Sequence, residues 1–297
     1  MKTLPRKHFD VLTCIEHFGS NKSQREIAEL TGMSVGSVNN TISDLTKEGL
    51  LYEKKLTEKA YEALEPYRAK RAIFIAAGFG SRLVPITLNT PKPLVRVNGV
   101  RMIDTQIDAV LAAGIEEIYI VRGYLGEQFD QLLYKYPMVK FIDNPLYNET
   151  NNISSAMAAR HLMENAYVME ADLVLYNPNV ITKYQYTSNY LGVPVDNTDD
   201  WCFTTTKNRV ITALKQGGTD CYHEFGISYW NKEDGAKLLE DIKTVYEMPG
   251  GKERYWDQAP LEFCKNNYHV EVRCCTFDDV IEIDTFSDLK KLDKSYR

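Results

Sequence analysis

The chain has 297 residues, 44% of them hydrophobic, and this is enough to bury more than one core because domains usually span about 100 to 200 residues. No apolar run approaches the roughly 20 residues of a membrane helix and no segment resembles a signal peptide, so we expect a soluble, cytoplasmic protein with no membrane partner. The net charge is +1 over the first 70 residues and −7 over the remainder, which argues against the strongly basic face of a tight nucleic-acid binder.

The cysteines show no Cys-x-x-Cys spacing, which argues against a structural zinc site and against a disulfide framework. Such usage is typical of a chain that stays in a reducing compartment. We therefore expect buried, reduced thiols at Cys14, Cys202, Cys221, Cys264, Cys274 and Cys275.

The N-terminal part has the pattern of two helices joined by the turn "TGMS", followed by "GLLYEKKLTEKAYEAL", which reads as a short pair of wing strands and a further helix. Apolar residues recur at helical spacing at Ile27, Leu30, Val38, Ile42 and Leu45. The pattern covers roughly residues 7–67 and resembles the winged helix-turn-helix domains of bacterial regulators. We assign residues 1–68 to such a domain.

DNA binding by residues 1–68 would depend on the side chains that the second helix presents. In this motif the second helix puts its first residues into the major groove. Here those residues are uncharged: Ser34, Val35, Gly36, Ser37, Asn39 and Asn40. Phosphate contacts need lysine or arginine, and the nearby ones are Lys22, Arg25, Lys47, Lys54 and Lys55. Two roles stay open, DNA binding and a docking or dimerisation module, and winged domains often form homodimers.

From Arg71 onward, short apolar runs alternate with amphipathic stretches. The runs "AIFIAA", "IEEIYIV", "VKFID" and "AYVMEAD" are strand-like, and "IDTQIDAVLAAG" and "LGEQFDQLLYKY" are helical. A strand-rich stretch, further helices and the strands "HVEVRCC" and "VIEID" follow. This rhythm predicts an α/β domain over residues 70–297, with a mostly parallel sheet covered by helices.

The loop after the first of these strands is placed for ligand binding, because ligands of open α/β sheets sit beyond the carboxyl ends of the strands. Gly78 and Gly80 let backbone N–H groups approach an anion closely, and phosphate is the ligand that we expect. The loop is not a Walker loop, and Leu83 stands where a dinucleotide fingerprint needs its third glycine.

The longer segment "AAGFGSRLVPITLNTPKPL" resembles the signature of nucleotidyltransferases that join an NTP to a phosphorylated sugar or alcohol. The matching positions are Gly78, Gly80, Ser81, Arg82, Pro85, Thr87, Pro91, Lys92 and Leu94. The resemblance implies a Rossmann-like, mostly parallel mixed sheet of the nucleotidyltransferase type. It also implies that Ala77, Gly78, Gly80, Ser81 and Arg82 hold the nucleotide and that Arg82 and Lys92 neutralise charge on the reacting phosphates.

Such a site needs a metal ion, because NTPs are bound as Mg²⁺ complexes through one or two carboxylates. Two strand-like runs end in aspartates, Asp172 and Asp284, and both match the aspartates of the resembled family. We expect these two to be catalytic and to hold Mg²⁺. An aspartate in such a place can also cap a helix, and "DTFSDLKKL" could use Asp284 in this way.

The resemblance narrows to the bacterial phosphocholine cytidylyltransferases, through "IVRGYLGEQFDQLLYKY", "NPLYNETNNISSA", "NAYVMEADLVL", "FGISYW", "RYWDQ" and "VIEIDT". By this likeness Gly123, Tyr124, Asn151 and Asn152 lie around the base and ribose of CTP. The alternative for "NNISSA" is a helix start at which Asn152 and Ser154 are only caps.

A quaternary ammonium has no N–H, so a protein holds it with aromatic faces and a nearby carboxylate. We expect this choline box at Trp201, Trp230, Tyr255, Trp256 and Asp257, although tryptophans are mostly core residues. The resemblance implies transfer of CMP from CTP to phosphocholine, giving CDP-choline and pyrophosphate.

Three alternatives stay open at this point. The first keeps the chemistry with another acceptor such as 2-aminoethylphosphonate, in which case a primary ammonium would prefer carboxylates and carbonyls. The second is a sugar-1-phosphate nucleotidyltransferase, which would need polar groups for hydroxyls. The third is a transcription regulator whose α/β domain only senses a nucleotide or a choline compound, and which has no need of the Arg82, Lys92, Asp172 and Asp284 set.

Overall fold

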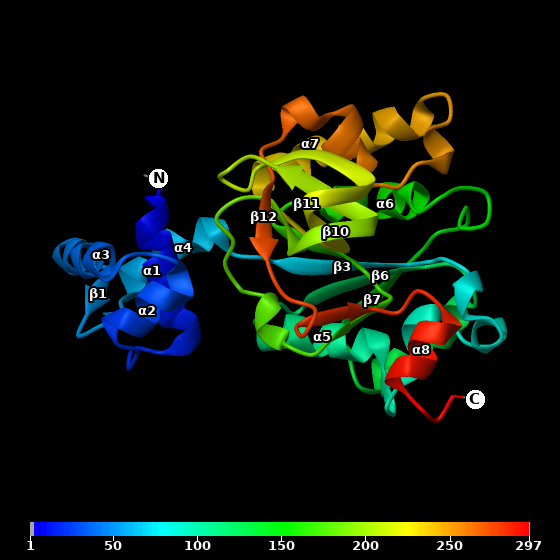
Figure 1. Cartoon of the computed structure of the whole chain (residues 1–297), viewed down its shortest axis with the longest axis horizontal. Coiled ribbons are helices and arrows are strands. Elements are labelled where there is room, and N and C mark those ends of the chain that lie inside the picture. Colours follow the sequence, from blue (N-terminus) through cyan, green and yellow to red (C-terminus); the bar gives the residue numbers. More distant parts are fainter. Residues whose placement is uncertain (1–2, 297) are drawn as a thin grey trace. The chain divides into compact units, whose positions relative to one another are not determined.

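The structure is a computed structural model that describes residues 3–296 and divides into two units, Met1–Arg68 and Ala69–Arg297. The first unit is helical with a small wing (Figure 1). Its elements are α1 (Arg6–Phe18), α2 (Gln24–Thr31), α3 (Val35–Lys47), β1 (Leu51–Tyr52), β2 (Lys55–Leu56), α4 (Glu58–Leu64) and a 3₁₀ turn (Glu65–Tyr67).

Local capping explains where the helices of the first unit begin. Ser23 caps α2 in a capping box with Glu26, and Ser34 caps α3 by accepting the Ser37 N–H. The winged helix-turn-helix expectation is therefore confirmed, with β1 and β2 as the wing. The positions expected to face DNA on α3 are exposed, except for the half-buried Ser37.

The second unit is built on a sheet with the strand order β12-β10-β11-β8-β3-β6-β7 within the described residues. These strands are β3 (Arg71–Ala76), β6 (Glu117–Arg122), β7 (Val139–Asp143), β8 (Ala166–Glu170), β10 (Asn189–Thr205), β11 (Ile211–Trp230) and β12 (Glu271–Cys274). The pairs β3–β6, β3–β8, β6–β7 and β10–β12 are parallel, whereas β11 runs antiparallel to both its neighbours. The mixed, mostly parallel sheet is as expected from the sequence.

Helices cover both faces of this sheet (Figure 1). The helix α5 (Met102–Ala112) packs against one face through Ile103, Ile107 and Val110. On the other face lie α6 (Ile153–Ala159) and α7 (Lys232–Glu247). The strand β3 contributes side chains to the hydrophobic cores on both faces of the sheet, because alternate residues of a strand point to opposite faces.

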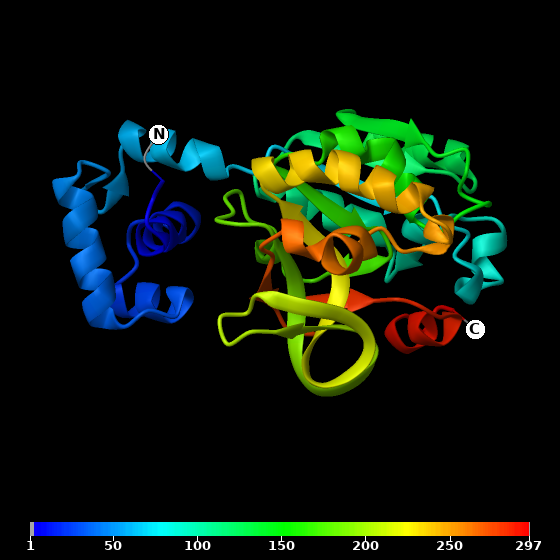
Figure 2. The ribbon, with the colours of Figure 1, turned by 90° about the horizontal axis from the view of Figure 1, so that it is seen from above.

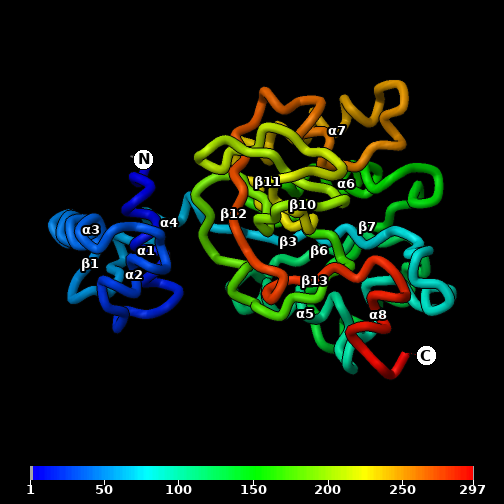
Figure 3. The backbone as a smooth tube through the Cα atoms, viewed as in Figure 1, coloured from blue at the N-terminus to red at the C-terminus, as the bar shows by residue number. Residues whose placement is uncertain are grey.

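Three features of the second unit, all within its described residues, extend beyond or lie outside the main sheet. The strands β10 and β11 continue beyond it as a long, curled hairpin (Figure 2). The strand β13 (Val280–Glu282), labelled in Figure 3, pairs with β9 (Leu173–Leu175) and leads into α8 (Phe286–Leu292). A small ladder joins β4 (Arg96–Val97) to β5 (Val100–Arg101). No helix of the described residues is long and apolar enough to cross a membrane.

Three expectations from the sequence need correction. The stretch "LGEQFDQLLYKY" forms a 3₁₀ segment, Gly126–Tyr134, in place of an amphipathic α-helix. The strand expected to end at Asp172 ends at Glu170, so that Asp172 lies in the turn before β9. Among the cysteines, Cys274 is exposed and Cys264 is half-buried, because each lies at the end of an element near the surface.

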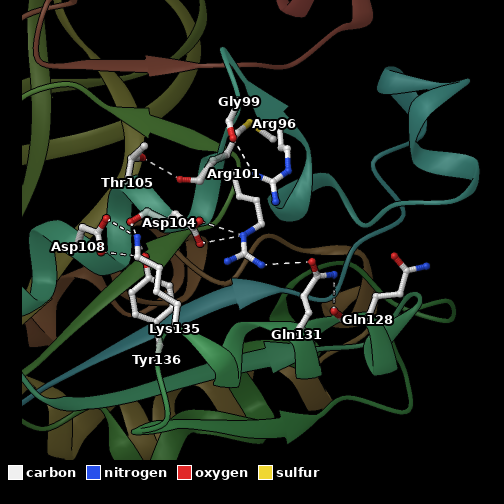
Figure 4. A network of polar contacts seen from close by, with 11 residues as sticks. Arg96, Gly99, Arg101, Asp104, Thr105, Asp108, Gln128, Gln131, Lys135 and Tyr136 are labelled. Carbon is white, nitrogen blue, oxygen red and sulfur yellow. Dashed lines mark hydrogen bonds and ion pairs between the residues drawn. The ribbon is translucent and has the colours of Figure 1, made fainter.

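A buried ion pair fixes the start of α5 (Figure 4). The Arg101 Nε lies 3.0 Å from both carboxylate oxygens of Asp104, and Arg101 Nη1 donates to Gln131 Oε1 at 3.2 Å. Both charged residues are less than a tenth exposed. The pair thereby joins β5 and α5 to the 3₁₀ segment that follows β6.

Replacing Asp104 by Ala should leave the Arg101 charge buried without its partner and lower the free energy of unfolding of the second unit by about 3–5 kcal/mol. The matched control is Lys135→Ala, which breaks an exposed pair with Asp108 and should cost less than ~1 kcal/mol. Urea unfolding can be followed by tryptophan fluorescence, because all the tryptophans lie in the second unit. Equal losses in the two variants would contradict a structural role for this pair.

Candidate active site

The loop after β3 is shaped by one glycine and one threonine. Gly80 has a φ of +61°, and a Cβ at this position would lie 2.8 Å from the Lys92 Cβ. The Thr87 hydroxyl donates to the Gly80 carbonyl at 2.8 Å, which closes the loop. Gly80 is thus required both by its backbone conformation and by the close approach of Lys92.

Lys92 lies under this loop and between two carboxylates. Its Nζ is 2.7 Å from Asp172 Oδ2 and 3.3 Å from Asp284 Oδ1. Arg82 reaches the same carboxylate from the outside, with Nη1 2.9 Å from Asp284 Oδ2 and Nη2 2.8 Å from Asp284 Oδ1. The structure therefore brings together all four charged residues that the sequence selected.

The environment keeps Lys92 charged. The residue is only 8% exposed, and burial by itself would lower the pKa of its ammonium group. The carboxylates of Asp172, Asp284 and Glu282 outweigh burial and hold the pKa of Lys92 above its ordinary value. Lys92 is thus a fixed cation at the inner end of the loop.

A third carboxylate, Glu282, belongs to this cluster. Ligand atoms of Asp172, Glu282 and Asp284 lie within 4.8 Å of one another, which suits oxygen ligands around one divalent ion. Asp172 Oδ1 is buried and has no hydrogen-bond partner among the described residues. Binding of a cation would give this oxygen a partner. The residues present therefore fit a divalent cation.

Asp284 does not serve as a helix cap. The residue that caps α8 is Thr285, whose hydroxyl accepts the Asp288 N–H in a capping box. The Asp284 carboxylate is left for Arg82 and Lys92, so the capping alternative for this residue is wrong.

A pocket of about 230 Å³ opens between the loop and the ends of β3 and β8. Its lining combines the glycine loop, both cations and two acidic residues: Ile75, Ala76, Gly78, Gly80, Ser81, Arg82, Lys92, Pro93, Glu170, Ala171 and Asp172. Such a lining, which combines a glycine loop, two cations and two carboxyl groups, suits a polyphosphate together with a metal ion.

A second group of acidic side chains adjoins this pocket, formed by Glu170, Glu224 and Asp257. Burial, followed by the neighbouring carboxylates, raises the pKa of Glu170 and of Glu224 well above the ordinary value. Burial raises the pKa of Asp257 to about 6. Asp257 Oδ1 is buried without a hydrogen-bond partner among the described residues. A positively charged ligand would compensate the negative charge of these carboxyl groups when they are ionised.

The residues expected around the nucleotide base have varied surroundings. Ala77 is buried, and its carbonyl accepts the Tyr124 N–H at 3.0 Å. A Cβ at Gly123 would collide with the Tyr147 ring at 2.6 Å, so glycine is required there. The ring of Phe79 lies 5.1 Å from that of Tyr124 and 5.3 Å from that of Tyr147, and together these rings form an aromatic surface beside the loop.

Asn151 and Asn152 hold the acidic group in place. Asn151 donates its backbone N–H to the Lys252 carbonyl and its side-chain N–H to the Glu253 carbonyl. Asn152 donates to Glu170 Oε1 at 3.0 Å and accepts the Trp256 N–H at 2.8 Å. The Asn152 side chain makes no capping hydrogen bond to α6, so the capping alternative for this residue is wrong.

The expected choline box needs correction at two tryptophans. Trp230 is 0% exposed and donates its indole N–H to Ser228, and Trp256 is 3% exposed and stacks on Tyr190. Both belong to the core under α7, where burial of large aromatic surface stabilises the fold. Trp201 is half-buried and Tyr255 is 43% exposed, and their rings lie 5.6 Å apart.

The sequence reasoning missed Glu170, Glu224 and Glu282. Glu282 could have been found, because it precedes Asp284 by two residues and so points to the same side of an extended segment. Glu170 likewise precedes Asp172 by two residues. Nothing in the local sequence around Glu224 indicates that it faces this site.

Comparisons with known proteins agree with this geometry. The family described as Nucleotidyl transferase matches residues 71–191, and the MarR family matches residues 2–58. A 2-aminoethylphosphonate cytidylyltransferase of Lancefieldella rimae is 35% identical over 76% of this chain and 92% of its own length. A choline-phosphate cytidylyltransferase of Streptococcus pneumoniae is 32% identical over 75% and 97%.

Among solved structures, the CTP:phosphocholine cytidylyltransferase of Streptococcus pneumoniae superposes with a TM-score of 0.68 at 31% identity. The match covers 77% of this chain and 100% of the other. The similarity in structure therefore covers a length equal to nearly all of the second unit, and the Nucleotidyl transferase match includes the glycine loop.

Proposed function

This chain belongs to the nucleotidyl transferase family, as a cytidylyltransferase that acts on phosphorylated acceptors, and from this premise we propose that it transfers CMP from CTP to a small acceptor that carries a primary ammonium group, of the 2-aminoethylphosphonate kind. The observation that carries the proposal is the convergence of Lys92, Arg82, Asp172 and Asp284 beside a pocket that continues to an acidic group.

The transfer is an in-line substitution at the α-phosphorus of CTP. An oxygen of the acceptor's phosphonate or phosphate forms the new bond to phosphorus, and the bond to the bridging oxygen breaks, releasing pyrophosphate. No general base is needed, because a phosphate with a second pKa of about 6 is largely a dianion near neutral pH. The product is the mixed anhydride of CMP and the acceptor, with a P–O–P linkage.

The chain's own residues position and neutralise the phosphates. Arg82 is exposed at the pocket mouth and presents a fork that matches phosphate oxygens, and Lys92 presents a point charge from below. Asp172, Glu282 and Asp284 would hold Mg²⁺, which supplies Lewis-acid stabilisation of the phosphate charge when bound. Positioning and electrostatics carry the rate.

The acceptor assignment follows from the acidic group. A quaternary ammonium cannot donate a hydrogen bond, whereas a primary ammonium donates three. Glu170, Glu224 and the unpaired Asp257 Oδ1 offer acceptors, and two of the three tryptophans expected for a choline box are buried in the core. Phosphocholine, which the sequence favoured, is the alternative, with Trp201 and Tyr255 as its aromatic surface.

DNA binding by residues 1–68 and a homodimer stay predictions from the winged fold. The MarR match supports that fold, and the uncharged residues at the start of α3 supply no phosphate contacts of their own.

Competition between the two acceptors tests the assignment. At fixed CTP and Mg²⁺, kcat/KM for 2-aminoethylphosphonate should exceed that for phosphocholine by at least ~10-fold, because three methyl groups leave buried carboxylates without donors. Pyrophosphate release measures both reactions. A preference for phosphocholine would overturn the acceptor assignment, and release with neither acceptor would favour a nucleotide sensor over an enzyme.

Replacing Lys92 by Ala should lower turnover by about 10²–10³-fold, because it removes a fixed cation from the site where charge develops. The matched control is Lys243→Ala on the exposed face of α7, which should keep wild-type turnover. Far-UV circular dichroism would check that both variants fold. A Lys92→Ala protein with unimpaired turnover would refute the role assigned to this residue.

The pKa of Asp257 predicts a pH dependence of acceptor binding. With a pKa of about 6, this carboxyl is charged above that pH and neutral below it, so KM for the cationic acceptor should rise as the pH falls from about 7 to about 5. In Asp257→Asn the KM should be higher than that of the wild type above about pH 6, should approach the wild-type value near pH 5, and should lose this part of its pH dependence. Because the acceptor's phosphonate titrates equally in both proteins, identical pH profiles would rule out Asp257 as the responsive group.

A further inference from the structure

A second set of metal-ligating side chains lies beside the catalytic carboxylates. Asp200 on β10, His223 on β11 and Glu282 on β13 each present one ligand atom, and these atoms lie within 4.8 Å of one another. The three residues come from strands far apart in the sequence, whose courses can be followed in Figure 3. The proposed transfer reaction gives no role to Asp200 or His223.

Neighbouring groups hold the imidazole of His223 in one orientation. Its ring lies 5.0 Å from that of Phe225 and 5.4 Å from that of Phe277. His223 Nδ1 is 3.4 Å from the Thr198 hydroxyl, which also accepts the Asp200 N–H at 3.2 Å. Thr198 thus supports two of the three ligands at once, in the manner of residues that orient metal ligands from behind.

The third ligand lacks a partner of its own. Glu282 is half-buried, and its carboxylate makes no hydrogen bond or ion pair with any residue of the described chain. Lys92 contacts Asp172 and Asp284 and does not pair with Glu282. An unpaired carboxylate in such surroundings is costly unless a cation compensates it.

The set is distinct from the acidic group assigned to the acceptor. His223 and Glu224 are consecutive on β11 and therefore point to opposite sides of the strand. His223 packs with Phe225 and Phe277, whereas Glu224 accepts the Gly226 N–H and interacts electrostatically with Asp257 and, to a smaller degree, with Asp200 and Asp172. Only Glu282 is shared, and it is shared with the carboxylates Asp172 and Asp284.

We propose that Asp200, His223 and Glu282 bind a second divalent cation, of the transition-metal class that accepts an imidazole nitrogen, next to the all-oxygen site of Asp172 and Asp284. Mg²⁺ prefers oxygen ligands, whereas Zn²⁺ and Co²⁺ bind imidazole and carboxylate together. Because Glu282 belongs to both groups, an ion held by His223 would fix this carboxylate against the first ion. The proposal concerns metal binding and does not rest on the identity of the acceptor.

Equilibrium dialysis of the full chain against Co²⁺ tests the proposal, in an excess of Mg²⁺ and without nucleotide. The wild-type protein should retain one Co²⁺ per chain, because Mg²⁺ competes for the oxygen site and not for the imidazole. His223→Ala should weaken retention by at least ~10-fold, and Thr198→Val should weaken it to a smaller degree. His269→Ala, which removes an exposed histidine beside Glu271, is the matched control and should retain Co²⁺ as the wild type does.

Thermal unfolding in the presence of EDTA would show whether each variant is folded, and His223→Asn, which keeps a polar side chain, serves as a second variant. Equal Co²⁺ retention by wild type and His223→Ala, or no retention by the wild type, would overturn the proposal. So would displacement of Co²⁺ by 2-aminoethylphosphonate or phosphocholine alone, since the three residues would then belong to the acceptor site. These outcomes leave pyrophosphate release by the transfer reaction unaffected, so the two proposals fail separately.

Discussion

The structure of the active site depends on one buried lysine held between two aspartates. Lys92 cannot be buried as a cation without them, and Asp172 and Asp284 could not lie so close together without a cation between them. This mutual requirement ties the loop after β3 to the turn after β8 and to the end of β13, which are segments about 80 and 190 residues apart in the chain.

Several local features allow Lys92 to contact Asp172 and Asp284. Gly80 allows the loop to lie against Lys92, and Thr87 closes it. Thr285 caps α8, so the carboxylate of its neighbour Asp284 can pair with Lys92 and Arg82. Further acidic side chains lie near the same point: Glu170, Glu224 and Asp257 interact electrostatically with one another, and Asp200 lies with His223 and Glu282. A site so rich in carboxylates is suited to cations, whether metal ions or an ammonium group.

The short-range parts of this arrangement could be predicted from the sequence. The glycine loop, Arg82 and Lys92 lie within one motif, and the alternation of strands and helices placed Asp172 and Asp284 at the same edge of the sheet. Residues whose roles depend on long-range packing could not be predicted. The sequence cannot tell a tryptophan that lines a pocket from one that fills a core, and Trp230 and Trp256 fill the core. Glu224 lies opposite Gly192 of β10, and its position near the site depends on this strand pairing, which the local sequence does not indicate.

The aspartates around Lys92 form the centre of the proposed CMP transfer reaction. The most direct test compares wild type with Asp172→Asn. The quantity measured is the rate of pyrophosphate release from CTP and 2-aminoethylphosphonate in the presence of Mg²⁺. Removal of one ligand charge from the metal and one partner from Lys92 should slow release by at least about 10²-fold in a protein that stays folded. Release by Asp172→Asn at the wild-type rate would contradict the account.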